Sequence, residues 1–282
     1  MAAVRVLEAF RRTEQGRPHS LPMPPPEMRA LVGPADQPWL FDNPTGSLVY
    51  PEFDARLYKR VFDFGCGCGR VARQLILQRP RPKRYVGIDL HRGMVEWCQK
   101  NLEPVAKGFE FHHHDVFNVS LNPGEGKPQT APFPVRPHSF SLVNAHSVFT
   151  HLTETQAEHY LRETARILEP TGVLRSTWFV FDKEVFPMMQ EFQNALFIND
   201  RDPSNAVIFD RAWLRTTASD AGLVIYSITP PAVRGFQWEV RMTPRRKGVE
   251  EAEFPPDTAP TGSLRPPPMP ENATEIGLDD RH

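Results

Sequence analysis

The placement of proline limits where this 282-residue chain can form regular structure. Of its 30 prolines, only six fall within residues 61–122 and 138–229, and the others lie before, between and after these two blocks. Proline lacks a backbone N–H and breaks helices and central strands, so the proline-rich segments are excluded from long regular elements. The sequence therefore predicts one domain of ordinary size, with an N-terminal approach segment, an internal loop and a tail.

The bulk composition narrows the class of protein. Hydrophobic residues make up 40% of the chain, which is enough to bury a core. The 33 basic and 34 acidic side chains leave no basic excess, so we expect no nucleic-acid partner. We also expect no membrane span, because no apolar run approaches the roughly 20 residues that a spanning helix needs. Three cysteines form no disulfide framework, and together these features favour a cytoplasmic protein.

Short β-rich runs alternate with helical patterns along the middle of the chain. Strands are predicted at residues 60–64, 84–90, 109–111, 139–143 and 172–181, with helices at 70–78, 91–102, 153–168 and 210–222. Such alternation implies a parallel sheet covered on both faces. Two last strands, 223–228 and 237–242, have no helix between them and must run antiparallel. We therefore predict an α/β fold: a doubly wound, mostly parallel seven-stranded sheet with an antiparallel last strand.

A glycine-rich turn follows the first predicted strand, in the run Asp63-Phe-Gly65-Cys-Gly67-Cys-Gly69-Arg70. Alternate glycines at a strand-to-helix turn permit positive φ angles and allow a ligand to approach the backbone closely. The helix N-terminus beyond them favours a carboxylate or phosphate. Asp89 lies 20 residues after Gly69, at the end of the second predicted strand. A carboxylate at this place can accept both hydroxyls of an adenosine ribose. The pattern predicts an adenosine-containing ligand at this edge of the sheet.

Two ligand classes fit this geometry. A dinucleotide site requires G-x-G-x-x-G, but Arg70 occupies the third glycine position, and no Tyr-x-x-x-Lys pair is present. The order of acid, alternate glycines, second acid and closing hairpin instead resembles the class I S-adenosylmethionine-dependent methyltransferases. The resemblance covers roughly residues 55–243 and implies a Rossmann-like methyltransferase fold. The stretch Asn144 to Leu152 is similar to one common in bacterial members.

The resemblance implies the following roles. The glycines would lie against the methionine part of S-adenosylmethionine, Asp63 near its ammonium and Asp89 on the ribose, with Leu90 beside the adenine. Asp115 would accept from the adenine amino group, with the Val116 N–H as a neighbour. The expected cofactor-binding residues are Asp63, Gly65, Cys66, Gly67, Gly69, Arg70, Asp89, Leu90, Asp115, Val116 and Ala145.

Three residues are candidates for proton transfer. Ligands of open α/β sheets lie outside the carboxyl ends of the strands, so His146, after the fourth strand, would face the transferred methyl group. A histidine can remove a proton from a hydroxyl or amine. His151 is a further candidate, although a role in capping the next helix is favoured. Asp182, after the fifth strand, is the third candidate base.

Two segments are expected to cover the site. Residues 182–210 are rich in aromatic residues and methionine, and at this place in the fold they would form a lid over the acceptor pocket, or pack as a buried helix. Trp39 to Gly46 would close over the cofactor. The predicted organisation is thus a cap segment at 1–54, the catalytic domain at 55–243 and a disordered tail at 244–282.

No metal site is expected. His112, His113 and His114 are adjacent, but successive strand residues point to opposite faces, and no Cys or carboxylate set with ligand spacing accompanies them. Cys66 and Cys68 lie inside the glycine turn, where small residues fill the loop. Plain strand-end histidines and loop cysteines are the favoured interpretation.

The predicted function is transfer of a methyl group to a hydroxyl or amine of a small molecule, sugar or lipid-linked glycan. DNA is disfavoured, because Asn144-Ala-His-Ser147 stands where DNA amino-methyltransferases carry Asn/Asp-Pro-Pro-aromatic. The alternatives are a protein methyltransferase, an NAD(P)-dependent reductase and a non-catalytic cofactor-binding scaffold. For the last, the run Arg265 to Pro270 could dock an aromatic groove of a partner.

Overall fold

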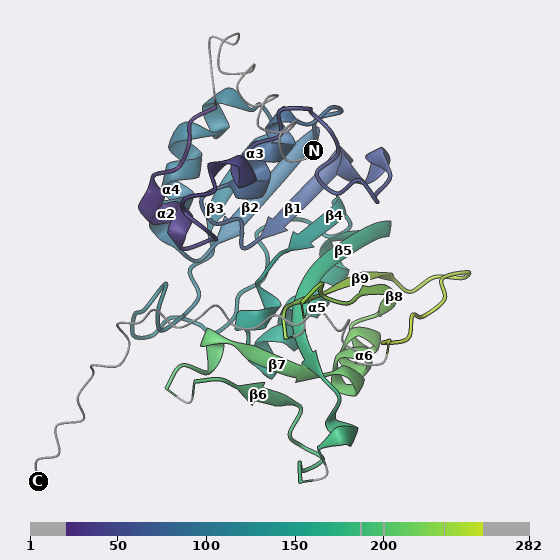
Figure 1. The fold of residues 1–282 in the computed structure, drawn as a ribbon. Helices are drawn as coiled ribbons and strands as arrows, with labels where there is room; N and C mark the ends of the chain where they lie inside the picture. Colours follow the sequence, from purple (N-terminus) through teal and green to yellow (C-terminus); the bar gives the residue numbers. More distant parts are fainter. Residues whose placement is uncertain (1–20, 187, 200, 234, 256–282) are drawn as a thin grey trace, which may run out of the picture.

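The computed structural model describes residues 21–186, 188–199, 201–233 and 235–255 (Figure 1). The predictions for residues 1–20 of the cap segment and for residues 256–282 of the tail lie outside this range. In the described part, none of the helices has the length and apolar character needed to cross a membrane.

The described elements alternate as the sequence pattern indicates. The strands are β1 (Arg60–Phe64), β2 (Arg84–Asp89), β3 (Phe109–His113), β4 (Phe140–Ala145), β5 (Leu168–Phe181), β6 (Ala195–Phe197), β7 (Val207–Asp210), β8 (Leu223–Thr229) and β9 (Trp238–Pro244). The α-helices are α2 (Pro26–Ala30), α3 (Arg70–Leu77), α4 (Arg92–Asn101), α5 (Glu154–Ile167) and α6 (Arg211–Asp220). Short 3₁₀ turns are η1 (Pro38–Phe41), η2 (Ala55–Lys59), η3 (Glu103–Val105), η4 (Phe149–His151), η5 (Lys183–Val185) and η6 (Pro203–Asn205).

The sheet has the predicted parallel core. Strands lie in the order β3-β2-β1-β4-β5, and each neighbouring pair is parallel. The last two strands form an antiparallel hairpin, and β9 adds antiparallel to β5. The predicted fold class is therefore confirmed. Two strands were not foreseen: β7 pairs parallel with the end of β5, and β6 pairs antiparallel with β7, so the sheet has nine strands.

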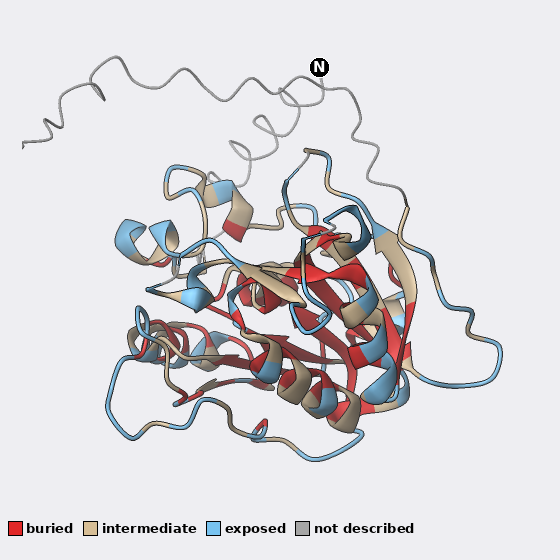
Figure 2. Cartoon of the chain, turned by 90° about the horizontal axis from the view of Figure 1, so that it is seen from below, coloured by how far each residue is buried: buried red, intermediate tan, exposed pale blue. Residues whose placement is uncertain are grey.

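Hydrophobic side chains are buried on both faces of the sheet, because alternate strand residues point to opposite sides. Phe62 and Phe64 of β1 join a cluster that includes α5 and α6, whereas Val61 joins a cluster with α3 and α4. Figure 2 shows the buried residues gathered along the strands and the inner helix faces, with exposed residues on the outside. Both faces are thus covered by helices, as a parallel sheet requires.

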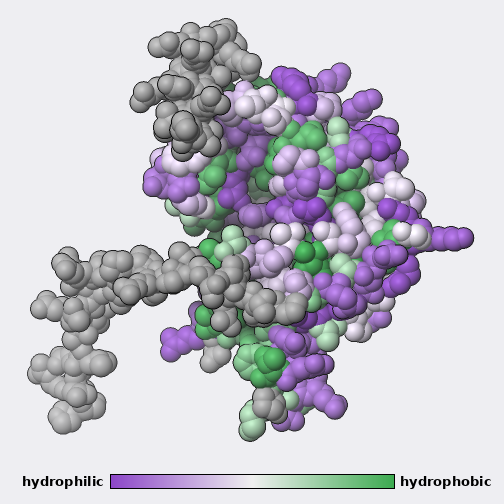
Figure 3. Space-filling model, turned by 45° about the vertical axis from the view of Figure 1, so that its right-hand side comes forward, coloured by the Kyte–Doolittle hydropathy of each residue, from purple (hydrophilic) through white to green (hydrophobic). Residues whose placement is uncertain are grey.

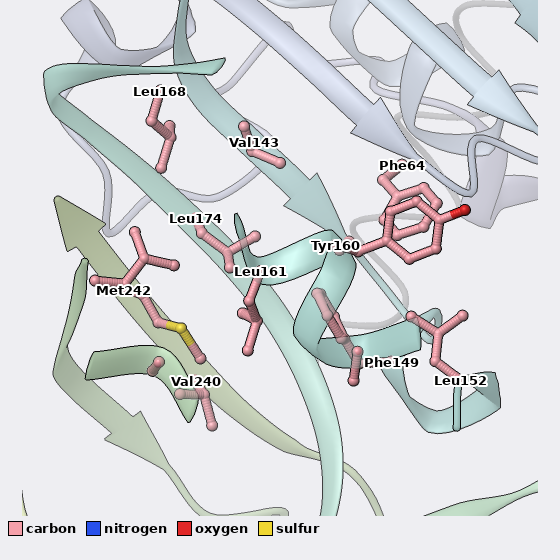
Figure 4. Packing of buried hydrophobic residues seen from close by; sticks show 14 of the residues in the cluster. Phe64, Val143, Phe149, Leu152, Tyr160, Leu161, Leu168, Leu174, Val240 and Met242 are labelled. Atoms are coloured by element: carbon pink, nitrogen blue, oxygen red, sulfur yellow. The ribbon is translucent and has the colours of Figure 1, made fainter. Parts of the chain in front are cut away.

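Helix α5 begins at a capping box formed by Thr153 and Gln156, as the sequence indicates. It packs Tyr160 and Leu161 against the sheet, alongside Leu174 of β5 (Figure 4). Trp178 is fully buried, and its ring stacks on Phe149 with centroids 4.2 Å apart. This packing fixes the segment between β4 and α5 that carries the candidate histidines.

The start of the tail is packed against the domain. Arg215 of α6 forms ion pairs with Glu251 and Glu253, the latter at 2.6 Å, and the N–H of Ala252 donates to the carbonyl of Ile225. Phe254 contacts the core cluster. The prediction of a disordered tail from residue 244 is therefore wrong for residues 245–255.

The insertion between β5 and α6 is neither a buried helix nor an aromatic lid. Its apolar residues Phe186, Met188 and Phe192 are 45%, 87% and 78% exposed. The insertion forms the projection at the lower end of Figures 1 and 3, where hydrophobic side chains reach the surface. Its later part turns back to the domain: β7 joins the sheet, and Asp202, Ser204 and Asn205 line a cavity.

Candidate functional site

One cavity of about 570 Å³ lies at the carboxyl ends of the parallel strands. Its volume falls in the range of roughly 300–1,000 Å³ that is usual for small-molecule sites. Its walls come from the glycine turn, the ends of β2, β3 and β4, the N-terminal segment and the insertion. The residues that line it include Val32, Asp63, Gly65, Cys66, Gly67, Arg70, Asp89, Leu90, His114, Val116, Asn144, His146, Ser147, Val148, His151 and Ser204.

The glycine turn is shaped by close contacts as well as by its backbone angles. Gly65 and Gly67 have φ angles of 77° and 52°. A Cβ at Gly65 would lie 2.4 Å from Cγ2 of Val148, and one at Gly67 would lie 2.6 Å from Cγ1 of Val32. The turn is thus pressed between the segment after β4 and the N-terminal segment. Only glycine satisfies both the angle and the space at these two positions.

Gly69 was expected to bind the cofactor, but it does not line the cavity. A Cβ there would lie 2.6 Å from Cδ1 of Leu102 and 3.1 Å from Sγ of Cys98. Its small size therefore allows α3 to approach the α4 region. Cys66 lines the cavity as expected, whereas Cys68 is fully buried away from it.

Asp89 ties the end of β2 to the glycine turn. One carboxylate oxygen accepts the N–H of Gly67 at 2.8 Å, and the other accepts the N–H of His91 at 2.8 Å. Burial raises the pKa of Asp89 above its ordinary value, and these two hydrogen bonds oppose the rise. Each oxygen keeps a second acceptor position, so the carboxylate can brace the turn and still face a ligand in the cavity. Leu90, beside it, lines the same wall.

Asp63 lies at the end of β1 and is only 1% exposed. Its carboxylate accepts from the hydroxyl of Tyr85 and from the side-chain amide of Asn144, each at 2.7 Å. Burial raises the pKa of Asp63 to about 6, although both hydrogen bonds act against the rise. No basic side chain of the described chain forms an ion pair with Asp63. A cationic ligand group at this place would supply the missing countercharge.

Asn144 connects Asp63 to Tyr50 and Arg175, a role that was not predicted from the sequence. It stands opposite Asp63 in the parallel pairing of β1 and β4. Its side-chain oxygen accepts from the hydroxyl of Tyr50 at 3.0 Å and from Arg175 at 3.2 Å, while its amide donates to Asp63. Arg175 in turn pairs with Glu239 of β9 at 2.5 Å. A signal for this network exists only in the strand order, because the partners of Asn144 are 31 to 94 residues away from it in the chain.

The N-terminal segment covers the cavity at a different place from the one predicted. Leu31, Val32 and Gly33 line it, and Nη1 of Arg70 donates to the carbonyl of Val32 at 2.9 Å. Trp39, by contrast, is 51% exposed, and no residue of Trp39 to Gly46 lines the cavity. The expected closure by that run is therefore wrong. Arg70 does line the cavity and brings a guanidinium group to it.

The segment after β3 also differs from expectation. Asp115 does not line the cavity; its carboxylate is bound by Nζ of Lys127 at 2.8 Å and by the amide of Asn122 at 3.0 Å. These hydrogen bonds lower the pKa of Asp115 to about 2. Val116 is buried in the cavity wall, but its N–H donates to the carbonyl of His114 at 2.8 Å. The position of the Asp115 carboxylate therefore differs from the one expected for an adenine contact.

His114 occupies the wall where Asp115 was expected. Its Nε2 lies 2.8 Å from the hydroxyl of Tyr160, and burial lowers its pKa to about 4. His113 instead approaches the carbonyl of Leu90, and His112 faces Glu110. Among the residues that the structure describes, no group of three His, Cys, Asp or Glu side chains could hold a metal ion.

The segment after β4 places His146 in the cavity wall. Burial, followed by the positive charges of Arg70 and Arg175, lowers the pKa of His146 to about 4. The imidazole is therefore neutral near pH 7 and can accept a proton. Ala145, expected to contact the cofactor, has its methyl group in the hydrophobic core and is not part of the wall.

His151 and Asp182 differ in their position relative to the cavity. His151 lines the cavity, and its Nδ1 lies 3.1 Å from the carbonyl of Ser204 in the insertion. It does not cap α5, since Thr153 holds that position. Asp182 does not line the cavity; its carboxylate accepts the N–H of Glu184 at 3.0 Å and caps a short 3₁₀ turn. The structure thus brings His146 and His151 to the site and leaves Asp182 outside it.

The insertion closes the cavity through polar contacts with the segment after β3. The amide of Asn118 donates to the hydroxyl of Ser204 at 3.2 Å, and the hydroxyl of Ser120 donates to Asp202 at 2.9 Å. Together with the contact between His151 and Ser204, these bonds join three chain segments. Polar contacts, rather than the exposed aromatic residues, therefore form the cover that the sequence predicted.

Comparison with known proteins agrees with this arrangement. Residues 61–172, which run from β1 into β5, match the family model described as a methyltransferase domain. This part of the chain is similar to the methyltransferase domains that the model describes. The match supports the prediction of a methyltransferase domain over this part of the chain. The matched part of the methyltransferase domain includes the glycine turn, Asp89, His114 and His146, so the cavity lies mainly within it.

Solved structures with a related fold cover most of this chain. A putative S-adenosylmethionine-dependent methyltransferase from Listeria monocytogenes is 14% identical over 69% of this chain and 94% of its own, with a TM-score of 0.48. The O-methyltransferase NcsB1 of neocarzinostatin biosynthesis, in complex with S-adenosylmethionine and a naphthoic acid, is 16% identical over 68% of this chain, with a TM-score of 0.45. The [4+2]-cyclase SpnF is 20% identical over 60% of this chain, with a TM-score of 0.40. The matches span about half of the lengths of NcsB1 and SpnF. At these identities the similarity concerns the fold alone.

Proposed function

We propose that this protein binds S-adenosylmethionine in the cavity and transfers its methyl group to a hydroxyl or amine of a small molecule, sugar or lipid-linked glycan. The observation that carries the proposal is the buried Asp63 carboxylate, which has no basic partner, beside a glycine turn that is braced by Asp89. The ammonium of an amino acid would neutralise the Asp63 carboxylate, and ribose hydroxyls would fit beside Asp89. Arg70, at the start of α3, can receive the carboxylate of the same amino acid.

The site fits this cofactor by its own geometry. The places that a Cβ would occupy at Gly65 and Gly67 are taken up by Val148 and Val32, so the turn is held in a fixed shape against which a ligand can lie. Leu90 and Val116 add apolar surface that suits a purine ring. When bound, S-adenosylmethionine supplies an electrophilic methyl group on its sulfonium. The residues of this chain bind it, orient it and exclude water.

His146 is proposed to assist the acceptor. Its neutral imidazole lines the same cavity as the glycine turn and can take the proton of a hydroxyl or amine as that group attacks. Positioning of the two reactants would provide most of the acceleration. His151, beside the insertion, would contact the acceptor rather than the cofactor.

Isothermal titration with S-adenosylmethionine and with S-adenosylhomocysteine tests the proposal. We expect both to bind with one site per chain. Incubation with isotopically labelled S-adenosylmethionine, followed by mass spectrometry of candidate acceptors, would then identify the acceptor. Absence of binding by either compound would refute the proposed function.

The proposal predicts a characteristic pH dependence. In the free protein the pKa of Asp63 is about 6, against an ordinary value of 3.8, so the stability that it contributes is greatest below pH 3.8 and is lost as the pH rises through 6. A bound ammonium favours the ionised carboxylate instead. Affinity for S-adenosylhomocysteine should therefore fall as the pH drops below 6, by up to about tenfold per pH unit.

Titrations at several pH values between 5 and 7.5 check this expectation. Above pH ~8 the ligand's own α-amino group loses its proton, which sets the upper limit of the window. Asp63→Asn should bind more weakly and show little pH dependence between 5 and 7.5. Asp54→Asn is a suitable control, because Asp54 pairs with Arg56 at the surface. A wild-type affinity that is constant over this range would contradict the assigned role of Asp63.

A further inference from the structure

Ser147, directly after His146, has an unusual backbone conformation. Its φ angle is 58°, and among the described residues other than glycine only His138 shares a positive value. Such a conformation is unfavourable for a residue with a Cβ and persists only where the surroundings enforce it. Because Ser147 lines the cavity, the strained turn lies at the site itself.

Two side chains that are far from Ser147 in the sequence hold this turn. The N–H of Ser147 donates to Oγ1 of Thr177 at 2.7 Å, and Nε2 of Gln237 donates to Oγ of Ser147 at 2.8 Å. The hydroxyl of Thr177 donates to Oε1 of Gln237 at 2.6 Å, which closes a triangle. Thr177 lies on β5 and is 4% exposed, and Gln237 immediately precedes β9. The closing hairpin of the fold thus reaches the site through Gln237.

The turn determines where its neighbours lie. On one side, Val148 packs against the glycine turn, 2.4 Å from where a Cβ of Gly65 would be. On the other side, His146 borders the cavity, and its ring makes no hydrogen bond with any described residue. The backbone of the turn is therefore the main constraint on the direction of the imidazole.

We infer that Thr177 and Gln237 are positioning residues, which hold the Ser147 turn so that His146 faces the acceptor end of the cavity. The inference rests on the proposed function, since it assigns a purpose to His146. Neither residue lines the cavity, so both act through Ser147 and make no contact with a ligand there. The charged groups that face His146 are Arg70 of α3 and Arg175 of β5.

Histidine NMR titration of the full chain measures the position of His146 without any acceptor. The ¹⁵N imidazole signals are followed from pH 3.5 to 8, and the His146 signal is assigned with His146→Asn. In Thr177→Val and Gln237→Leu, the released ring should gain solvent, and its titration midpoint should rise by about one pH unit or more toward 6.5. Thr177→Ser keeps the hydroxyl and should restore the wild-type midpoint.

Two further readouts separate positioning from general damage. His114 lines the same cavity but bonds to Tyr160, so its titration should stay unchanged in all three variants. Ser147→Gly keeps the backbone bond to Thr177 and removes the strain, and should perturb His146 less than Gln237→Leu does. If Thr177→Val does not fold, Gln237→Leu, with its partly exposed side chain, carries the test alone.

The outcomes distinguish this inference from the proposed function. A His146 midpoint that is unchanged in Gln237→Leu and in any folded Thr177→Val would overturn the positioning role. S-adenosylhomocysteine titration of the same variants should give dissociation constants within about threefold of wild type, because neither substitution changes a residue that lines the cavity. A wild-type protein that binds no S-adenosylhomocysteine refutes the proposed function, whereas the His146 shift reports on the turn independently.

Discussion

Asp89→Asn is expected to weaken binding of S-adenosylhomocysteine by about a hundredfold or more. The carboxylate accepts two backbone N–H groups, from Gly67 and His91, and its remaining acceptor positions face the cavity. An amide can replace only one oxygen acceptor, and its NH₂ group would confront the other N–H. Each lost hydrogen bond to a charged group is worth about 1.5–3 kcal/mol. Isothermal titration of the purified variant measures the effect directly.

Asp115→Asn is the matched control for this substitution. The sequence assigned Asp115 to the cofactor, but the structure turns its carboxylate to Lys127 and Asn122. We therefore expect a change of less than about threefold in affinity and a small loss of stability, as is usual for exposed ion pairs. A loss as large as that of Asp89→Asn would show that Asp115 contacts the ligand, and would contradict its position in this structure.

Gly65→Ala should be severe, because two separate penalties meet at this residue. The φ angle of 77° strains any residue with a Cβ by about 1–2 kcal/mol. The new methyl group would also lie 2.4 Å from Cγ2 of Val148, a contact that must be relieved by movement of one of the two turns. Together we expect a loss of roughly 2–5 kcal/mol in the free energy of unfolding, and strongly weakened binding of S-adenosylhomocysteine.

Gly126→Ala separates the two penalties. Gly126 has nearly the same φ angle, 76°, but a Cβ there meets nothing within 4 Å. This variant should lose only the conformational part, about 1–2 kcal/mol, with unchanged ligand affinity. Adding Val148→Ala to Gly65→Ala should recover part of the loss. Chemical denaturation of the four proteins provides the comparison, and equal losses in Gly65→Ala and Gly126→Ala would rule out the steric contribution.

Patterns within short stretches of sequence were sufficient for most elements of the fold. The apolar run before Gly65, the capping box at Thr153 and Gln156, and the helix-free hairpin at the end each depend on neighbours a few residues away. The positions of Asp63 and Asp89 follow from the same local logic, since each ends a strand beside the glycine turn. Asp63, Gly65 and Asp89 all line the cavity.

Predictions that required a side-chain direction were less successful. Asp115 follows β3 as expected, but Lys127 and Asn122, from the loop beyond, bind its carboxylate away from the site. Asp182 caps its own short turn. Phe186, Phe192 and Phe197 of the insertion stay exposed, because β6 and β7 extend the sheet instead of folding over the cavity. For Asp115 and the insertion, contacts outside the local pattern decided the outcome, whereas for Asp182 a local cap did.

The sequence by itself therefore determined the order of elements, the glycine turn and the two acids at the strand ends, because each depends on backbone preferences and on spacing along the chain. Only the tertiary structure decided that Asn144 would face Asp63, that His114 would replace Asp115 in the wall, and that Thr177 and Gln237 would hold the turn at Ser147. The hydrogen bonds among these residues join positions 30 to 90 residues apart, so they exist only once the sheet has set the strands side by side. The hydrogen-bond partners in the buried site are determined by which strands lie next to each other, and the local sequence pattern does not indicate this.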